Sequence, residues 1–162
     1  RVGVVGMGGL GHVGVQIAAA MGAETIVLSR TLSKQDDGLK LGAKGYYATE
    51  DRESLKELRG TFDLILSTVS DGIDLDLLLS LVKTEGVVVA VRMGGLVGPQ
   101  KVLAGSNIGG IALTQEMLDF CAEHGVAAVV ETIDADQITE AYDKVVSSQV
   151  RYRYVIDAAT IG

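Results

Sequence analysis

The fold is decided by the stretch VGVVGMGGLG, residues 2–11. Its first half is a β-branched run that ends at Gly6, which is typical of a strand buried in a parallel sheet. Gly6, Gly8 and Gly11 then satisfy the spacing G-x-G-x-x-G, and apolar residues recur at four-residue spacing from 13 to 21, as in an amphipathic helix. A second β-branched strand is expected over 25–28.

The glycines of this turn predict a phosphate-binding site. Gly6 permits the tight turn, Gly8 lets the backbone approach a pyrophosphate, and Gly11 lets the helix pack against the strand. Free N–H groups at the start of a helix attract anions. We therefore expect the phosphates of a dinucleotide to be bound by Gly6, Gly8, Gly9, Leu10 and Gly11. A glycine-rich turn with a purely structural role is the alternative.

Strands and helices alternate along the rest of the chain. Further strands are expected over 46–48, 62–66, 87–91, 104–108, 128–131 and 152–156, and further helices over 33–42, 53–58, 75–82, 114–123 and 135–146. We expect Ser33 to cap its helix, paired with Asp36. This order predicts an α/β protein of the Rossmann type, a doubly wound parallel sheet with helices on both faces. A dinucleotide-binding domain is expected over 1–125 and a C-terminal strand–helix–strand appendage over 126–162.

The bulk properties argue against several classes of protein. The chain has 162 residues, of which 48% are hydrophobic, enough for a substantial core. A formal net charge of −7 argues against nucleic acid or an anionic membrane as a partner. No apolar run approaches the roughly 18 residues that cross a bilayer, and the single cysteine, Cys121, fits a cytoplasmic location. Because the chain starts at Arg1 and enters a strand at once, we expect a piece of something longer.

The residues after the second strand bear on the choice of cofactor. An NAD site has an Asp or Glu there that accepts the ribose 2′-hydroxyl. This sequence has Ser29 and Arg30, followed by Ser33 and Lys34. Two cations and a hydroxyl suit a 2′-phosphate, which a carboxylate would repel. We therefore expect NADP(H) in preference to NAD(H), with two solvated surface cations as the alternative.

Several stretches carry a resemblance to a known family. They are VGVVGMGGLGH (2–12), LSRTLSK (28–34), FDLILSTV (62–69), GSNIGG (105–110) and VRYRYVID (150–157). In this order they resemble the zinc-dependent medium-chain alcohol dehydrogenases, especially the branch similar to cinnamyl alcohol dehydrogenase. The resemblance spans nearly the whole chain and covers the cofactor-binding part of such enzymes.

The resemblance implies further contacts with the cofactor. It assigns the adenosine 2′-phosphate to Ser29, Arg30 and Lys34. Five further residues are expected from it beside the nicotinamide and its ribose: Thr68, Val69, Ser106, Asn107 and Ile108. It also implies that Arg151 reaches the pyrophosphate, with Arg153 as a close competitor.

Zinc is expected only in a catalytic domain that this chain lacks. The resemblance implies Cys, His and Glu ligands on that domain, whereas one Cys and two His cannot build such a site here. We expect His12 beside the phosphates at the start of a helix, His124 as a cation at the end of another, and Cys121 as a small core residue. The connection over 92–104, which in the family contacts nicotinamide and reaches the edge strand used for dimer pairing, is shorter here. A homodimer through that edge is an expectation.

Three functions remain open at this point. The first is the NADP(H)-binding domain of an alcohol dehydrogenase or aldehyde reductase, an oxidoreductase in which this chain orients nicotinamide for hydride transfer and is inactive alone. The second is a stand-alone NADP(H)-binding or redox-sensing module without catalysis. The third is a stable fragment whose cleft has lost its affinity. The sequence contains neither the Tyr-x-x-x-Lys pair of short-chain dehydrogenases nor a P-loop.

Overall fold

The computed structural model describes the whole chain except residues 71, 73, 92–95, 98–100 and 107. The strands are β1 Val2–Val5, β2 Thr25–Ser29, β3 Gly45–Ala48, β4 Phe62–Ser67, β5 Val82–Val91, β6 Leu96–Val97, β7 Val102–Ser106, β8 Val130–Ile133 and β9 Arg153–Ile156. The α-helices are α1 Gly11–Ala20, α2 Gln35–Lys40, α3 Leu75–Leu81, α4 Ile111–His124 and α5 Ile138–Val146. Short 3₁₀ turns lie at η1 Ser54–Leu58, η2 Ala135–Gln137 and η3 Ala158–Thr160.

The main sheet has the strand order β3-β2-β1-β4-β5-β7-β6. All neighbours in it are parallel except β6, which runs antiparallel to β7 at the edge. The chain order reverses beside β1, where β2 and β3 lie on one side and β4 on the other. The predicted doubly wound α/β fold is therefore confirmed.

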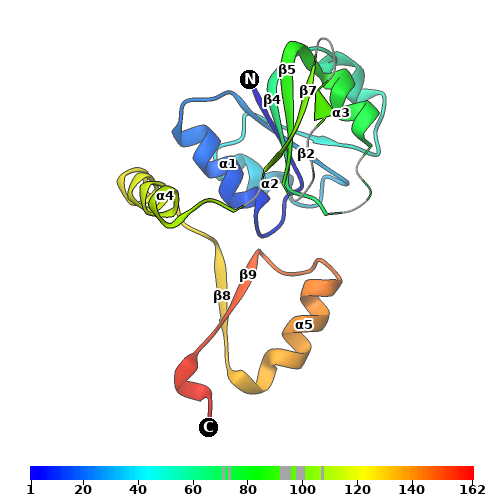
Figure 1. Ribbon diagram of the computed structural model, residues 1–162. Coiled ribbons are helices and arrows are strands. Elements are labelled where there is room, and N and C mark those ends of the chain that lie inside the picture. Colours follow the sequence, from blue (N-terminus) through cyan, green and yellow to red (C-terminus); the bar gives the residue numbers. More distant parts are fainter. Residues whose placement is uncertain (71, 73, 92–95, 98–100, 107) are drawn as a thin grey trace.

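Helices cover the sheet on both faces, as Figure 1 shows for α1 and α3. Consecutive residues of β1 point in opposite directions, because side chains alternate along a strand. Val4 packs with Val15 of α1 in one apolar cluster. Val5 packs in a second cluster with Leu78 and Leu81 of α3. A sheet buried on both faces explains why its central strands are almost wholly apolar.

The turn from β1 into α1 is unusually tight. Gly6 has a φ of +92°, which only glycine adopts without strain. A Cβ at Gly11 would lie 1.8 Å from the carbonyl oxygen of Gly6. No side chain fits there, so the first residue of α1 lies against the end of β1.

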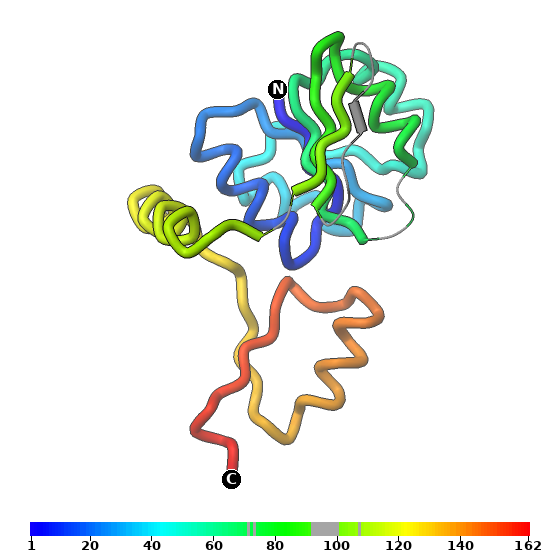
Figure 2. Tube along the Cα trace, in the orientation of Figure 1, coloured from blue at the N-terminus to red at the C-terminus, as the bar shows by residue number. Residues whose placement is uncertain are grey.

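The last part of the chain extends away from the main sheet. After α4, strands β8 and β9 form a separate parallel pair, joined through η2 and α5. The tube in Figure 2 shows that the start of β9 returns to the glycine-rich turn after β1. We call residues 126–162 the tail. Its contacts with that turn bring together segments more than a hundred residues apart in the sequence.

Several expected boundaries are corrected by the structure. Ser33 does not cap a helix, because its hydroxyl accepts a hydrogen bond from Thr31 and α2 starts at Gln35 with no side-chain cap. The helices expected over 53–58 and at the start of 135–146 are 3₁₀ turns, at η1 and η2. The strand expected over 104–108 ends at Ser106, and the one expected over 128–131 starts at Val130.

The tight turn predicts opposite effects for two glycines of α1. Gly11→Ala must move backbone apart, so we expect a loss of about 2–3 kcal/mol in the free energy of unfolding. Gly14 is the matched control, since a Cβ there would meet Leu66 at an ordinary 3.4 Å. Gly14→Ala should stabilise the chain by roughly 0.5–1 kcal/mol through helix propensity. Urea unfolding followed by circular dichroism measures both, and equal effects would contradict this account of the turn.

Candidate functional site

A cleft of about 860 Å³ opens where β1, β2, β3 and β4 end at their carboxyl side. This is where parallel sheets bind ligands, beside the reversal of strand order. Of the predicted cofactor-binding residues, its lining includes Gly6, Gly8, Gly9, Leu10, Ser29, Arg30, Lys34, Thr68 and Val69. The structure thus brings the two halves of the expected site, the glycine turn and the end of the second strand, into one cleft.

The glycine turn presents an open backbone to this cleft. A Cβ at Gly8 would meet no atom of the chain within 4 Å, in contrast to Gly11, which lies behind the turn. Helix α1 starts at the turn with no side-chain cap and no acidic residue in its first turn. Its first N–H groups therefore lack side-chain acceptors, and their partial positive charge suits the binding of an anion.

Three consecutive carbonyl groups of the turn are each held by a side chain. Lys34 Nζ donates to the oxygen of Met7 at 3.1 Å. His12 Nδ1 lies 3.0 Å from the oxygen of Gly8, and Arg153 Nη2 donates to that of Gly9 at 3.1 Å. The turn is thus fixed by hydrogen bonds from α1, from the start of α2 and from the tail.

The end of β2 carries no carboxylate. Ser29 is half-buried at the last position of the strand, and Arg30 beside it is exposed. Lys34 is half-buried, and its ammonium lies 4.9 Å from the centre of the Tyr152 ring. Burial, and then the neighbouring Arg151, lower the pKa of Lys34. This rim of the cleft therefore has a positive character without a matching acid at the strand end.

The residues predicted to border nicotinamide are only partly brought together. Thr68 and Val69 lie directly against Gly6, where a Cβ would come within 2.6 Å of the Val69 side chain, and the Thr68 hydroxyl donates to the oxygen of Val5 at 2.8 Å. Ser106 ends β7 and Ile108 is almost fully exposed, and neither belongs to the described lining of the cleft. Asn107 and most of the shortened connection after β5 lie outside the described residues.

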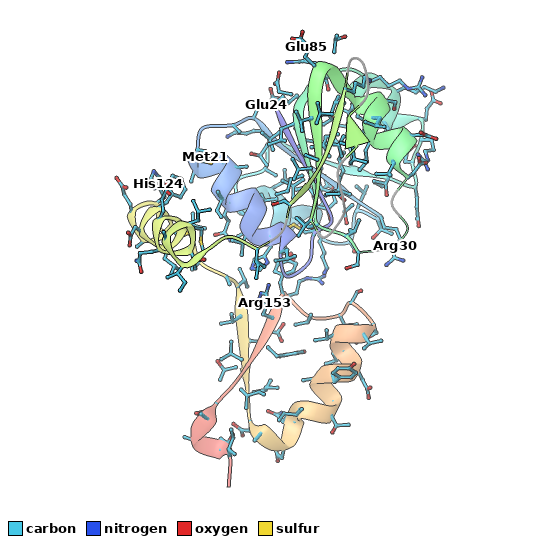
Figure 3. All side chains as sticks on the ribbon, viewed as in Figure 1. Met21, Glu24, Arg30, Glu85, His124 and Arg153 are labelled. Carbon is cyan, nitrogen blue, oxygen red and sulfur yellow. The ribbon has the colours of Figure 1, made fainter. Side chains whose placement is uncertain are left out.

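The two arginines of the tail have different neighbours. Arg151 pairs with Asp37 of α2 at 3.0 Å. Arg153 lies over the turn at Gly9, at the junction labelled in Figure 3. Arg153 is therefore the arginine nearer the open backbone, although the sequence favours Arg151.

His12 is placed differently from the expectation. Its side chain is fully buried under the turn and does not face the cleft. His12 Nε2 accepts a hydrogen bond from the Val129 N–H at 3.0 Å, so Nδ1 carries the proton that Gly8 accepts. The ring also stacks on Tyr152 at 4.6 Å. His12 therefore fastens the tail to the turn in its neutral form.

Several charged or polar lining residues were not among the predicted site residues. Thr49, Glu50 and Arg52 follow β3, and Asp74 caps α3 and pairs with Arg52 at 2.8 Å. The sequence could have predicted them, because the residues that follow the strands of a parallel sheet all lie at the same edge.

The remaining candidate residues lie away from the cleft. Cys121 is buried against Met117, as expected of a small core residue. His124 ends α4 and stacks on Phe120 at 4.1 Å. In the part of the chain that the structure describes, no three His, Cys, Asp or Glu side chains are grouped for a metal ion, and no described helix is long and apolar enough to cross a membrane.

Comparison with known proteins places this geometry among dehydrogenases. A family model for zinc-binding dehydrogenases matches residues 9–103. The chain is 52% identical over 170 aligned residues to NADP-dependent alcohol dehydrogenase C of Mycobacterium tuberculosis. It is 40% identical to the aldehyde reductase YahK of Escherichia coli. Each alignment covers 99% of this chain and 49% of the other protein, so the chain spans about half the length of these relatives.

Solved structures agree with the relatives. A cinnamyl alcohol dehydrogenase from Sorghum bicolor superposes with a TM-score of 0.90 at 39% identity. A cinnamyl alcohol dehydrogenase from Helicobacter pylori, in complex with NADP(H), gives 0.86 at 34% identity. Both matches cover 98% of this chain and 48% of the other chain.

Acidification is expected to loosen the tail from the turn. Burial lowers the pKa of His12 below its usual 6.5, and the charges of Arg153 and Lys34 act in the same direction. A histidine whose folded pKa is lowered stabilises the fold fully above the unfolded pKa and loses that effect as pH falls below it. Each pH unit below 6.5 should cost up to about 1.4 kcal/mol until the folded pKa is reached.

Urea unfolding at neutral pH and at about pH 5.5 measures this loss. His12→Gln should lower stability at neutral pH and remove most of the pH dependence in this range. The matched control is His124→Gln, whose described ring contacts are with Phe120 of the same helix. An unchanged pH dependence in His12→Gln would show that another group is responsible.

Proposed function

Because this chain belongs to the zinc-binding dehydrogenase family, we propose that it is the NADP(H)-binding part of an alcohol dehydrogenase or aldehyde reductase. The observation that carries the proposal is the cleft itself, where an open glycine turn faces a strand end that holds Ser29 and Arg30 and no carboxylate. The relatives named for NADP-dependent alcohol oxidation support the same cofactor.

The pyrophosphate would be held at the glycine turn. Backbone N–H groups at the start of α1 supply the donors, and the space at Gly8 allows close approach. Arg153 adds a guanidinium beside Gly9, which suits a bidentate contact with phosphate oxygens. We therefore assign this contact to Arg153 in preference to Arg151, whose guanidinium is occupied by Asp37.

The adenosine 2′-phosphate would be held at the rim of the cleft. Ser29 offers a hydroxyl, and Arg30 and Lys34 offer positive charge along the same rim. A group with nearly two negative charges gains from both cations, whereas a bare 2′-hydroxyl gains little from either. The rim therefore favours NADP(H) over NAD(H).

The other end of the cleft would receive the nicotinamide. Thr68 and Val69 form its described wall, and we retain Ser106, Asn107 and Ile108 as predicted contacts along its far side. Bound there, the cofactor would supply hydride transfer to or from a substrate carbon. This chain's residues bind and orient it, and the zinc that polarises the substrate oxygen would belong to the half of the relatives that this chain does not match.

The exposed apolar side chains support a place in a larger protein. They gather on α4 and in the tail, at Ile111, Leu113, Leu118, Val130, Ile138, Tyr142, Val146, Val155 and Ile156. Apolar surface of this extent marks a contact with further protein. We propose that the domain boundary lies at Gly125, which ends α4 with a left-handed conformation, and that the tail packs on the remaining half. Dimer pairing at the β6 edge stays a prediction.

Removal of the exposed rim cation should weaken one cofactor selectively. Arg30→Ala is expected to lower NADPH affinity about ten-fold, since it deletes a charged contact with phosphate, and to leave NADH affinity unchanged. Isothermal titration of the chain with both cofactors measures this. Arg59→Ala is the matched control, an exposed arginine outside the cleft. Wild-type chain that binds NADPH no better than NADH would end the proposal of NADP(H) preference.

Bulk at Gly8 should affect binding without affecting folding. A side chain there meets no atom of the chain, so Gly8→Val is expected to keep the melting temperature within about 2 °C. It should abolish binding of NADPH and NADH alike, because the side chain would occupy the phosphate position. Full NADPH affinity in Gly8→Val would exclude the turn as the phosphate site.

A further inference from the structure

Lys34 is held at the cleft by a residue that lies 118 positions later in the chain. Its ammonium bonds the oxygen of Met7 and lies over the face of the Tyr152 ring. An aromatic face attracts a cation most strongly where water is excluded, and Tyr152 is only 4% exposed. The Tyr152 ring therefore supports the Lys34 ammonium through a cation–π contact.

Tyr152 itself has little freedom to move. Its ring stacks on His12, and its hydroxyl donates to Asp37 at 3.0 Å. Burial and the Asp37 carboxylate both raise the pKa of Tyr152, so the hydroxyl stays a donor. The ring is thus fixed by contacts with α1 and with α2.

The bond to Asp37 has a second consequence for Lys34. Lys34 and Asp37 are three residues apart at the start of α2, a spacing at which opposite charges can pair with each other. Here the same Asp37 oxygen is taken by the Tyr152 hydroxyl and by Arg151, each at 3.0 Å. The described ion pairs of Asp37 include Arg151 and not Lys34. The tail thereby places a hydroxyl donor and a second cation on Oδ2 of Asp37, and both compete with Lys34 for this acid.

We propose that Tyr152 is a positioning residue for cofactor selectivity. It supports the Lys34 ammonium at the cleft and keeps Asp37 from pairing with it, so the tail sets how strongly the 2′-phosphate is recognised. This inference rests on the proposed function. It adds that selectivity for the phosphorylated cofactor depends on a residue outside the cleft lining, contributed by the segment that follows α5.

The test is the ratio of the NADH and NADPH dissociation constants, measured by isothermal titration. Tyr152→Met keeps an apolar side chain but has no aromatic face, and should lower the ratio about five-fold. Tyr152→Phe keeps the ring under Lys34 and should hold the ratio within about two-fold of wild type. A merely structural role would weaken both cofactors together and leave the ratio unchanged.

The same variants in a Lys34→Gln background provide the control. If Tyr152 acts through Lys34, Tyr152→Met should no longer change the ratio there. A double variant provides a second test. Tyr152→Phe combined with Arg151→Gln keeps the aromatic ring and removes both tail contacts of Asp37. It should also lower the ratio, and only while Lys34 is present.

The outcomes separate this inference from the proposed function. Wild-type chain without NADPH preference would refute the proposed cofactor choice and the inference with it. A wild-type preference that falls in Lys34→Gln, but persists both in Tyr152→Met and in the double variant, would overturn the role of Tyr152 alone. A fall in the ratio of equal size with and without Lys34 would also overturn it.

Discussion

The absence of a side chain at Gly11 lets α1 start in direct contact with the strand before it. A Cβ at that position would lie 1.8 Å from the Gly6 oxygen, so the two backbones approach as only glycine allows. This approach directs the first N–H groups of α1 toward the carboxyl edge of the sheet. Because the sheet is parallel, β2, β3 and β4 end at that same edge, and their following residues converge on one cleft.

The tight turn is only half of the support for this geometry. The oxygens of Met7, Gly8 and Gly9 point toward Lys34, His12 and Arg153, which take up their hydrogen-bonding capacity. With these carbonyl groups bonded, the turn is held in place while Gly8 stays open to the cleft. One of the three side chains belongs to the tail, and the ring of His12 bonds the tail backbone at Val129. The site is therefore assembled from both ends of the chain.

The sequence predicts well what short-range patterns determine. The strand, glycine turn and helix at 2–20 follow from local steric needs, and residues after parallel strands share an edge by topology, which explains Ser29, Arg30 and Thr68. It fails where a contact spans the chain. No local pattern predicts that His12 accepts a hydrogen bond from the Val129 N–H. Nor does any predict that Arg153, and not Arg151, bonds the turn. Serine is a residue type that often caps helices, yet the hydroxyl of Ser33 bonds Thr31 and the helix starts two residues later.

The bond between His12 and Val129 also orders events during biosynthesis. The two residues are 117 positions apart, so a ribosome that adds roughly 5–20 residues per second makes the turn several seconds or more before its partner. Strands β1 to β4 can pair with one another within that interval, because this pairing needs only residues that precede Val129. During translation, the nascent polypeptide thus carries a turn whose imidazole still lacks its backbone donor, and the junction with the tail can close only after Val129 has been made.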